Sequence, residues 1–264
     1  MDAAEAPKTP GERQSFLSHL EELRSRLVKA LLAVLVAFGL AYSQVDKIFS
    51  WLTVPLKTAL PNTPLVMIRL TEGFMTFLKL GLWTGLFLAS PVVLYQIWAF
   101  IAPGLYRHER RLIGPLVVAS TILFVAGAAL AYYFALPFML RYLMSGYSSE
   151  EVKPMLAVSS YVSSACLVMA TAGLIFQIPL VMLLLARMGI IKAAQLAKNR
   201  KYVLLVSFVI GAVLSPPDVF SQTLVSVPLF LLFEVSIWAI RVQDLLRRGK
   251  GTQQTPAAPP APAG

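Results

Sequence analysis

Charged residues are scarce in this chain. Only 14% of its 264 residues are Asp, Glu, Lys or Arg, whereas 57% are apolar. A soluble domain carries about 25% charged residues, so too little polar surface is present to cover a water-soluble globule. The formal net charge of +10 does not indicate a nucleic-acid partner, because the basic residues stand at the ends of apolar runs. A membrane protein is therefore expected.

The residues that build disulfides, metal centres and catalytic sites are also few. Cys166 is the single cysteine, so no intramolecular disulfide can form. The two histidines, His19 and His108, lie far apart in the sequence. The chain has no HExxH motif, no phosphate-binding loop and no nucleophile with an adjacent base. The sequence predicts no metal site, no cofactor and no catalytic residue.

Apolar runs of membrane-spanning length recur along the chain. About 20 apolar residues cross a hydrocarbon core about 30 Å thick. Six runs reach or approach this length, so the predicted fold class is all-α, a polytopic membrane protein with six transmembrane helices. The runs are Leu27–Ser43, Gly73–Ile101, Leu112–Leu136, Tyr161–Ala186, Tyr202–Leu214 and Val219–Ile240.

The fifth run is unusually short. Its 13 residues cover roughly 20 Å at 1.5 Å per residue. It forms either a re-entrant hairpin or a complete crossing that thins the bilayer locally. We favour the crossing, with helices five and six both short and a sharp turn at Ser215-Pro216-Pro217-Asp218 between them.

The distribution of lysine and arginine predicts the orientation. Sixteen of these residues fall in the N-terminal segment, the second and fourth loops and the C-terminal tail, against five in the other loops. Both termini are therefore expected on the cytoplasmic side of the plasma membrane. We expect a polar segment over 1–14, a six-helix membrane domain over 15–245 and a disordered Pro/Ala-rich tail over 246–264.

Two acidic residues at the expected inner face are candidates for binding. The segment 15–27, SFLSHLEELRSRL, has helical apolar spacing and predicts an amphipathic interfacial helix leading into the first span. It carries Glu22 one turn before Arg26. Glu109 stands among basic residues in the loop FIAPGLYRHERR, 100–111. Composition favours simple solvation as the role of Glu22, and spacing does not decide whether Glu109 neutralises its neighbours or binds a cationic ligand.

Small and polar residues inside the runs predict helix packing. Gly81 and Gly85 form a GxxxG pair, which indicates close approach of two helices. Gln96, Gln177 and Gln222 are expected to face partner helices or a cavity. Glu234 lies near the inner end of the last run, where it can reach water or basic residues.

Four segments together resemble TatC, the multispanning subunit of the twin-arginine protein translocase. They occur in the family's order and spacing, and the similarity covers roughly residues 15–245. The resemblance implies a signal-peptide receptor and core scaffold that exports folded proteins with energy from the proton gradient. The segments are HLEELRSRL (19–27), SPVVLYQIWAFIAPGLYRHERR (90–111), FQIPL (176–180) and LSPPDVFSQ (214–222).

The resemblance also implies partners and residue roles. Expected partners are twin-arginine signal peptides of folded cargo, single-span subunits (TatA, TatB type) and further copies of the chain. Gln177 stands where many relatives have glutamate, and because glutamine does not ionise, the resemblance implies a hydrogen-bonding role there and no titrating one. The implied roles are signal-peptide binding at Glu22, Arg24, Phe100 and Glu109, subunit contact at Gln177, Ser215, Gln222 and Thr223, and a function of the outer loop at Pro55.

Two other classes of multispanning protein fit the sequence less well. A secondary transporter for a small solute predicts inverted repeats and broken helices near the midplane, and no repeat relates the two halves of the sequence. An intramembrane enzyme needs a catalytic pair within the spans, and the runs contain none. Both alternatives are disfavoured.

Overall fold

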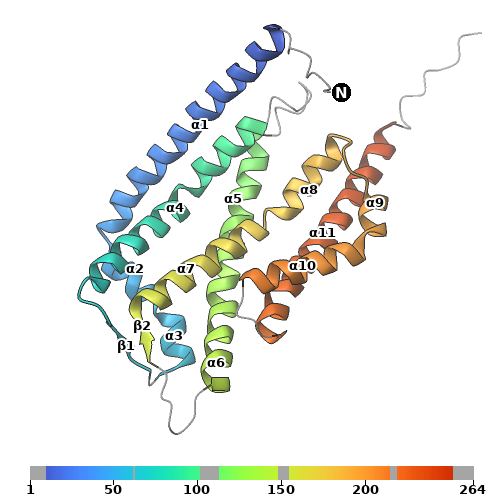
Figure 1. The fold of residues 1–264 in the computed structure, drawn as a ribbon. Helices are drawn as coiled ribbons and strands as arrows, with labels where there is room; N and C mark the ends of the chain where they lie inside the picture. Colours follow the sequence, from blue (N-terminus) through green and yellow to red (C-terminus); the bar gives the residue numbers. More distant parts are fainter. Residues whose placement is uncertain (1–9, 62, 102–112, 148–154, 215–218, 252–264) are drawn as a thin grey trace, which may run out of the picture. The chain divides into compact units, whose positions relative to one another are not determined.

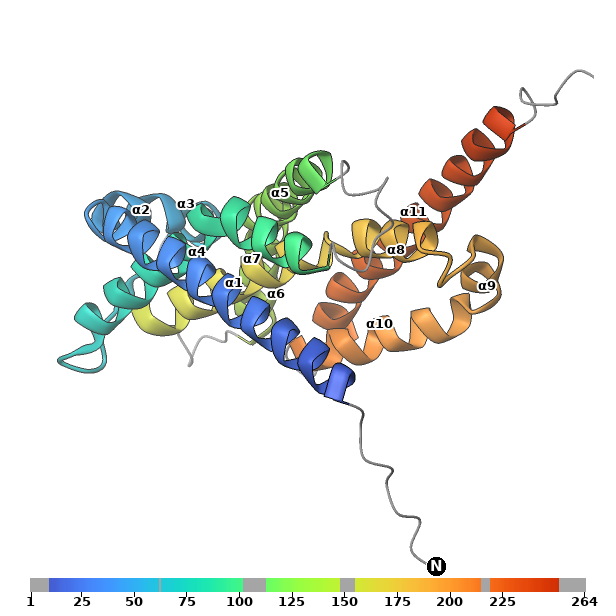
Figure 2. The same cartoon turned by 90° about the horizontal axis from the view of Figure 1, so that it is seen from above.

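The structure is a computed structural model that describes residues 10–61, 63–101, 113–147, 155–214 and 219–251. The described residues are almost entirely helical (Figures 1 and 2), which confirms the all-α prediction. The chain forms two compact units, residues 1–174 and 175–264.

The described residues of the first unit form seven helices, a π-helical turn and two short strands. The strands pair in parallel, with Leu65 opposite Leu156. The elements are α1 (Pro10–Tyr42), α2 (Val45–Leu52), α3 (Val54–Ala59), β1 (Leu65–Val66), α4 (Glu72–Ile101), α5 (Ile113–Leu130), the π-helical turn (Ala131–Ala135), α6 (Leu136–Tyr147), β2 (Leu156–Ala157) and α7 (Val158–Ile175).

Helices α1 and α4 form a long antiparallel pair (Figures 1 and 2). The GxxxG glycines of α4 allow the close approach. A Cβ atom at Gly85 would lie 2.7 Å from the backbone nitrogen of Phe38, and one at Gly81 would lie 3.1 Å from the rings of Phe38 and Tyr42. The predicted packing role of this pair is confirmed, because only glycine leaves room for the backbone of α1.

We expect Gly85→Ala to destabilise the protein by about 1–3 kcal/mol, the usual cost of overpacking. The new methyl group would clash with the backbone of Phe38, which cannot move aside by a change of rotamer. Thermal unfolding of the purified protein in detergent measures the loss. Gly39→Ala is the matched control, since no atom lies within 4 Å of its Cβ position. Equal stability of the two variants would contradict this packing role.

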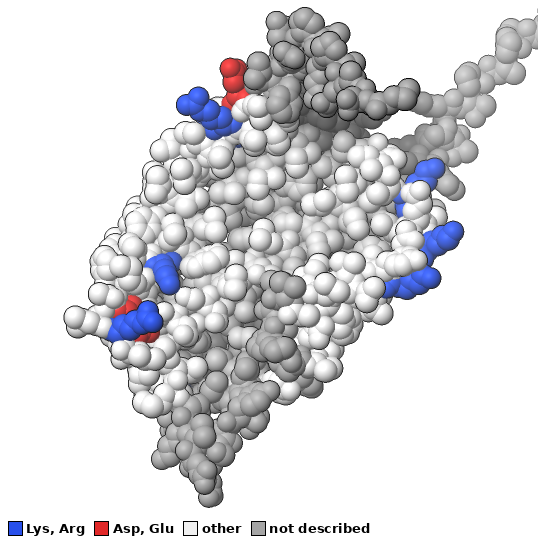
Figure 3. All heavy atoms as spheres, in the orientation of Figure 1, with Lys and Arg blue, Asp and Glu red and all other residues white. Residues whose placement is uncertain are grey.

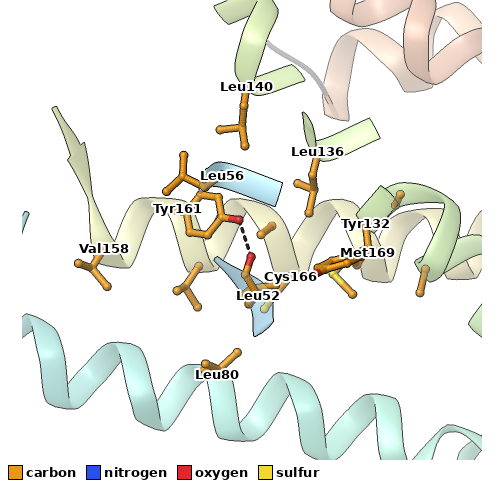
Figure 4. Close-up of a cluster of buried hydrophobic side chains, with 14 residues drawn as sticks. Leu52, Leu56, Leu80, Tyr132, Leu136, Leu140, Val158, Tyr161, Cys166 and Met169 are labelled. Atoms are coloured by element: carbon orange, nitrogen blue, oxygen red, sulfur yellow. Dashed lines mark hydrogen bonds between the residues drawn. The ribbon is translucent and has the colours of Figure 1, made fainter. Parts of the chain in front are cut away.

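Helices α2 and α3 fold over a buried apolar core (Figure 4). This core includes Leu52, Leu56, Leu80, Leu136 and Tyr161. The Tyr161 hydroxyl donates to the carbonyl of Leu52 at 2.6 Å. The Tyr132 hydroxyl, from the π-helical turn, donates to the carbonyl of Trp51 at 2.7 Å. Two tyrosines therefore hold the end of α2 by its backbone.

The second unit contains α8 (Ile178–Arg187), α9 (Ala193–Lys198), α10 (Arg200–Leu214) and α11 (Val219–Gly251). Helices α10 and α11 pack along each other (Figure 1). Ser226 of α11 is fully buried and donates to the carbonyl of Ser207 at 3.0 Å. A Cβ at Gly211 would lie 2.8 Å from the carbonyl oxygen of Gln222. Small residues therefore bring these two helices together.

Five stretches of the described helices are long and apolar enough to cross a membrane. Helix α10, with 15 residues, is not among them, so a sixth crossing remains a prediction. The composition and these stretches make the chain a multi-pass membrane protein. The stretches are Ser18–Tyr42, Glu72–Ile101, Gly114–Tyr142, Val158–Arg187 and Val225–Gln243.

The amphipathic segment expected to lead into the first span is continuous with that span in α1, because no Gly or Pro interrupts its helix-forming residues. Two other helix boundaries differ from the sequence-based expectations. The last helix was expected to be short, but α11 has 33 residues and continues beyond the apolar run through polar residues to Gly251. Helix α7 ends at Ile175 because Pro179, four residues later, cannot donate a hydrogen bond to the carbonyl of Ile175, and its ring would clash with that carbonyl in a continuous helix.

Candidate functional site

The described part of the candidate binding site lies where the beginning of α1 meets the end of α4. The imidazole of His19 stacks on the ring of Phe100, with centroids 4.5 Å apart and an interplanar angle of 21°. Phe100 is partly buried, whereas His19 is exposed. The structure thus brings together two of the segments that carry the resemblance, and His19 stands one helical turn before Glu22 on α1.

Glu22 has one carboxylate oxygen engaged and one turned toward His19. Its Oε1 accepts hydrogen bonds from Arg26 Nε at 3.0 Å and from Arg26 Nη2 at 2.5 Å. Its Oε2 lies 4.0 Å from His19 Nδ1, which is beyond hydrogen-bonding distance. The Glu22 side chain is 33% exposed. It therefore keeps an accessible carboxylate oxygen beside an aromatic surface.

Arg24 and Arg26 occupy different surroundings although only one residue separates them. Arg24 is exposed, and 200° of helix rotation separates it from Glu22. Arg26 lies one turn beyond Glu22 and is 23% exposed in its side chain. The predicted Glu22–Arg26 pair is confirmed. A cationic ligand would therefore compete with Arg26 for Oε1 of Glu22.

Glu109 and Ser215 lie outside the described residues. Their predicted roles stay predictions. Pro55 is described: it stands in the first turn of α3 and is buried, where its missing N–H is tolerated. Helix α3 packs against α6, so Pro55 belongs to the folded core at that end of the unit.

The other candidate contact residues belong to the second unit. Gln177 is 9% exposed and occupies the break between α7 and α8. Its carbonyl accepts from the backbone N–H of Val181 at 3.0 Å. Gln222 Nε2 donates to the carbonyl of Phe208 at 2.9 Å, and the Thr223 hydroxyl donates to the carbonyl of Val219 at 2.6 Å. Gln222 therefore links α11 to α10, as interhelical polar residues commonly do.

An ion pair between α10 and α11 was only partly expected. Arg200 Nη2 lies 2.7 Å from Glu234 Oε2. The position of Glu234 near basic residues predicted a cationic neighbour, and Arg200 is that neighbour. Sequence reasoning also did not anticipate His19 as part of the first site. Its stacking on Phe100 depends on how α1 and α4 are rotated against each other.

Several described helices long and apolar enough to span a membrane define a multispanning membrane protein. The family model of TatC, the Sec-independent protein translocase protein, matches residues 18–228. The chain belongs to the TatC family, which confirms the resemblance seen in the sequence. Proteins of this family take part in Sec-independent protein translocation.

Individual relatives agree with this assignment. The TatC protein of Desulforapulum autotrophicum is 38% identical, over 88% of this chain and 86% of its own length. That of Escherichia coli K12 is 39% identical, over 87% and 89% respectively. A crystal structure of the twin-arginine translocase receptor TatC matches with a TM-score of 0.75 at 38% identity. It covers 85% of this chain and 98% of the other.

Proposed function

We propose that this chain is the signal-peptide receptor and core scaffold of a twin-arginine translocase, working with single-span subunits and with further copies of itself. It crosses the membrane six times, with both termini in the cytoplasm, and the proton gradient drives export. The observation that carries this proposal is the accessible Glu22 carboxylate beside the Phe100–His19 stack.

The chemistry of a paired-arginine motif fits such a site. Each guanidinium is planar, permanently charged and able to donate a forked pair of hydrogen bonds to a carboxylate. Oε2 of Glu22 can accept one guanidinium while Oε1 keeps Arg26. Glu109 supplies the second carboxylate in this proposal. The faces of Phe100 and His19 offer a surface on which a guanidinium or an apolar side chain can stack.

Contacts with the single-span subunits are assigned to Gln177, Ser215, Gln222 and Thr223. Buried Gln177 offers an amide at a helix break, a place where a partner helix can exchange hydrogen bonds. Helix α10 covers about 22 Å at 1.5 Å per residue, less than the hydrocarbon thickness. A crossing this short would thin the bilayer beside those residues.

A photoreactive residue placed at Leu23 tests the receptor proposal. Leu23 is 42% exposed and adjoins Glu22 without being part of the proposed binding set. We expect crosslinks to a signal peptide with paired arginines and few to the same peptide with paired lysines, since lysine cannot form the forked contact. A photoreactive residue at Val36, on the same helix and 66% exposed, is the control. Equal crosslinking of both peptides would refute the assignment.

A further inference from the structure

A hollow of about 520 Å³ opens at the other end of the α1–α4 pair, where the beginning of α4 meets the beginning of α7. Its lining is mixed in chemistry. Two cationic side chains, Arg69 and Lys79, face it together with Ser159, Ser160 and the apolar Ile68. None of these residues belongs to the sites described above.

Glu72 also lines the hollow, but backbone donors already occupy its carboxylate. Oε2 accepts from the N–H groups of Ile68 at 2.6 Å and Arg69 at 3.2 Å, and Oε1 accepts from the N–H of Ser159 at 3.0 Å. Within the described part of the chain, neither Arg69 nor Lys79 forms an ion pair with a carboxylate. The three charges leave the hollow net positive, so it favours an anion.

The position of Lys79 indicates where that anion would be. Lys79 lies seven residues after Glu72 in the membrane-spanning stretch Glu72–Ile101, about 10 Å along the helix axis. A lysine within a span is costly unless its long side chain reaches back to the headgroups. The hollow lies in that direction, toward the start of α4.

The loop that leads from the hollow into α4, called the rim here, exposes apolar side chains that suit lipid. Of these side chains, that of Ile68 lines the hollow itself. Met67, Ile68 and Leu70 are 64%, 73% and 103% exposed, and they surround Arg69 in the loop before α4. Phe74 adds a 59% exposed ring in the first turn of the helix. In Figure 3, charged side chains gather at this end of α4, and uncharged surface continues along the span beyond them. Apolar side chains around a cation are typical of segments inserted among lipid headgroups.

We infer that this hollow binds the phosphate of an anionic phospholipid. Arg69 and Lys79 contact the phosphate, the serine hydroxyls donate to the rest of the headgroup, and Met67, Ile68 and Leu70 lie among the acyl chains. The lipid belongs to the outer leaflet under the proposed orientation. The binding itself does not depend on signal-peptide recognition, so either proposal can fail without the other.

Lipid binding to the purified full chain, measured by native mass spectrometry, tests this inference. Phosphatidylglycerol and phosphatidylcholine with the same acyl chains are the two probes. Each surface Lys or Arg contributes about fivefold to binding of anionic lipid. Arg69→Gln combined with Lys79→Gln should therefore weaken phosphatidylglycerol binding roughly 25-fold and leave phosphatidylcholine binding nearly unchanged.

Lys47→Gln combined with Lys57→Gln is the matched control. Both lysines are exposed, lie on α2 and α3 in the same unit, and do not line the hollow. An equal loss in this control would overturn the inference, because net charge alone would then explain the effect. Competition by inorganic phosphate as strong as that by the lipid would overturn it in favour of a free-phosphate site. Ile68→Ser with Leu70→Ser should weaken both lipids, and retention of both would contradict the insertion of the rim.

Discussion

Glu22→Gln should weaken binding of a paired-arginine signal peptide about tenfold, or about 1.4 kcal/mol. The substitution keeps the shape of the side chain and removes its charge. Hydrogen bonds to charged groups contribute about 1.5–3 kcal/mol when partly desolvated, and exposed ion pairs about 0.2–1 kcal/mol. The Glu22 side chain is 33% exposed, so the expected loss falls between these ranges.

Fluorescence anisotropy of a labelled signal peptide with the purified protein measures this loss. Glu21→Gln is the matched control, because Glu21 is an exposed acid on the same helix that points about 100° away from Glu22. The affinity of the Glu21→Gln protein for the signal peptide should change less than twofold, because solvent and salt screen an exposed charge that does not contact the peptide. Added salt should weaken the intact site and affect Glu22→Gln less. A Glu22→Gln protein that binds as tightly as the unaltered one would remove Glu22 from the site.

The pair of α1 and α4 shows how far the sequence determines this region. The helical spacing of Ser15–Leu27 and the position of Arg26 four residues after Glu22 predict the local ion pair, since such contacts depend on one helix alone. The GxxxG pair predicts a close helix contact without naming the partner. That Phe38 fills it, and that Phe100 then meets His19, depends on the relative rotation of two helices far apart in sequence.

The extent of α11 and the hollow beside Glu72 could not be predicted for related reasons. Hydropathy locates the apolar part of a helix but not its polar continuation, so the 33 residues of α11 exceeded the apolar run. In the sequence, Glu72 is a single acidic residue before an apolar run, and nothing there shows which groups its carboxylate contacts. Its three backbone partners come from the loop before α4 and from Ser159, and pairing of β1 with β2 brings them together.

Arg200→Gln should destabilise the second unit by about 2 kcal/mol. Glu234, its partner at 2.7 Å, stands within the apolar stretch Val225–Gln243, where an unpaired carboxylate is costly. Removing one member of a fully buried pair costs 3–5 kcal/mol, and the 46% and 30% exposure of these two side chains reduces the expected value. The loss is measured by thermal unfolding of the purified protein in detergent.

Combining Arg200→Gln with Glu234→Gln distinguishes the contribution of the ion pair to stability from any contribution that Arg200 makes by itself. The double variant removes both charges and leaves two amides able to hydrogen-bond, so it should be at least about 1 kcal/mol more stable than the sum of the single losses predicts. Lys198→Gln, an exposed cation in the last turn of α9, should change stability by less than about 0.5 kcal/mol. Strict additivity of the two single variants would show that Arg200 and Glu234 act independently. Coupling between them would show that the ion pair itself stabilises the contact between α10 and α11, the interface that also holds Ser207 and Gln222.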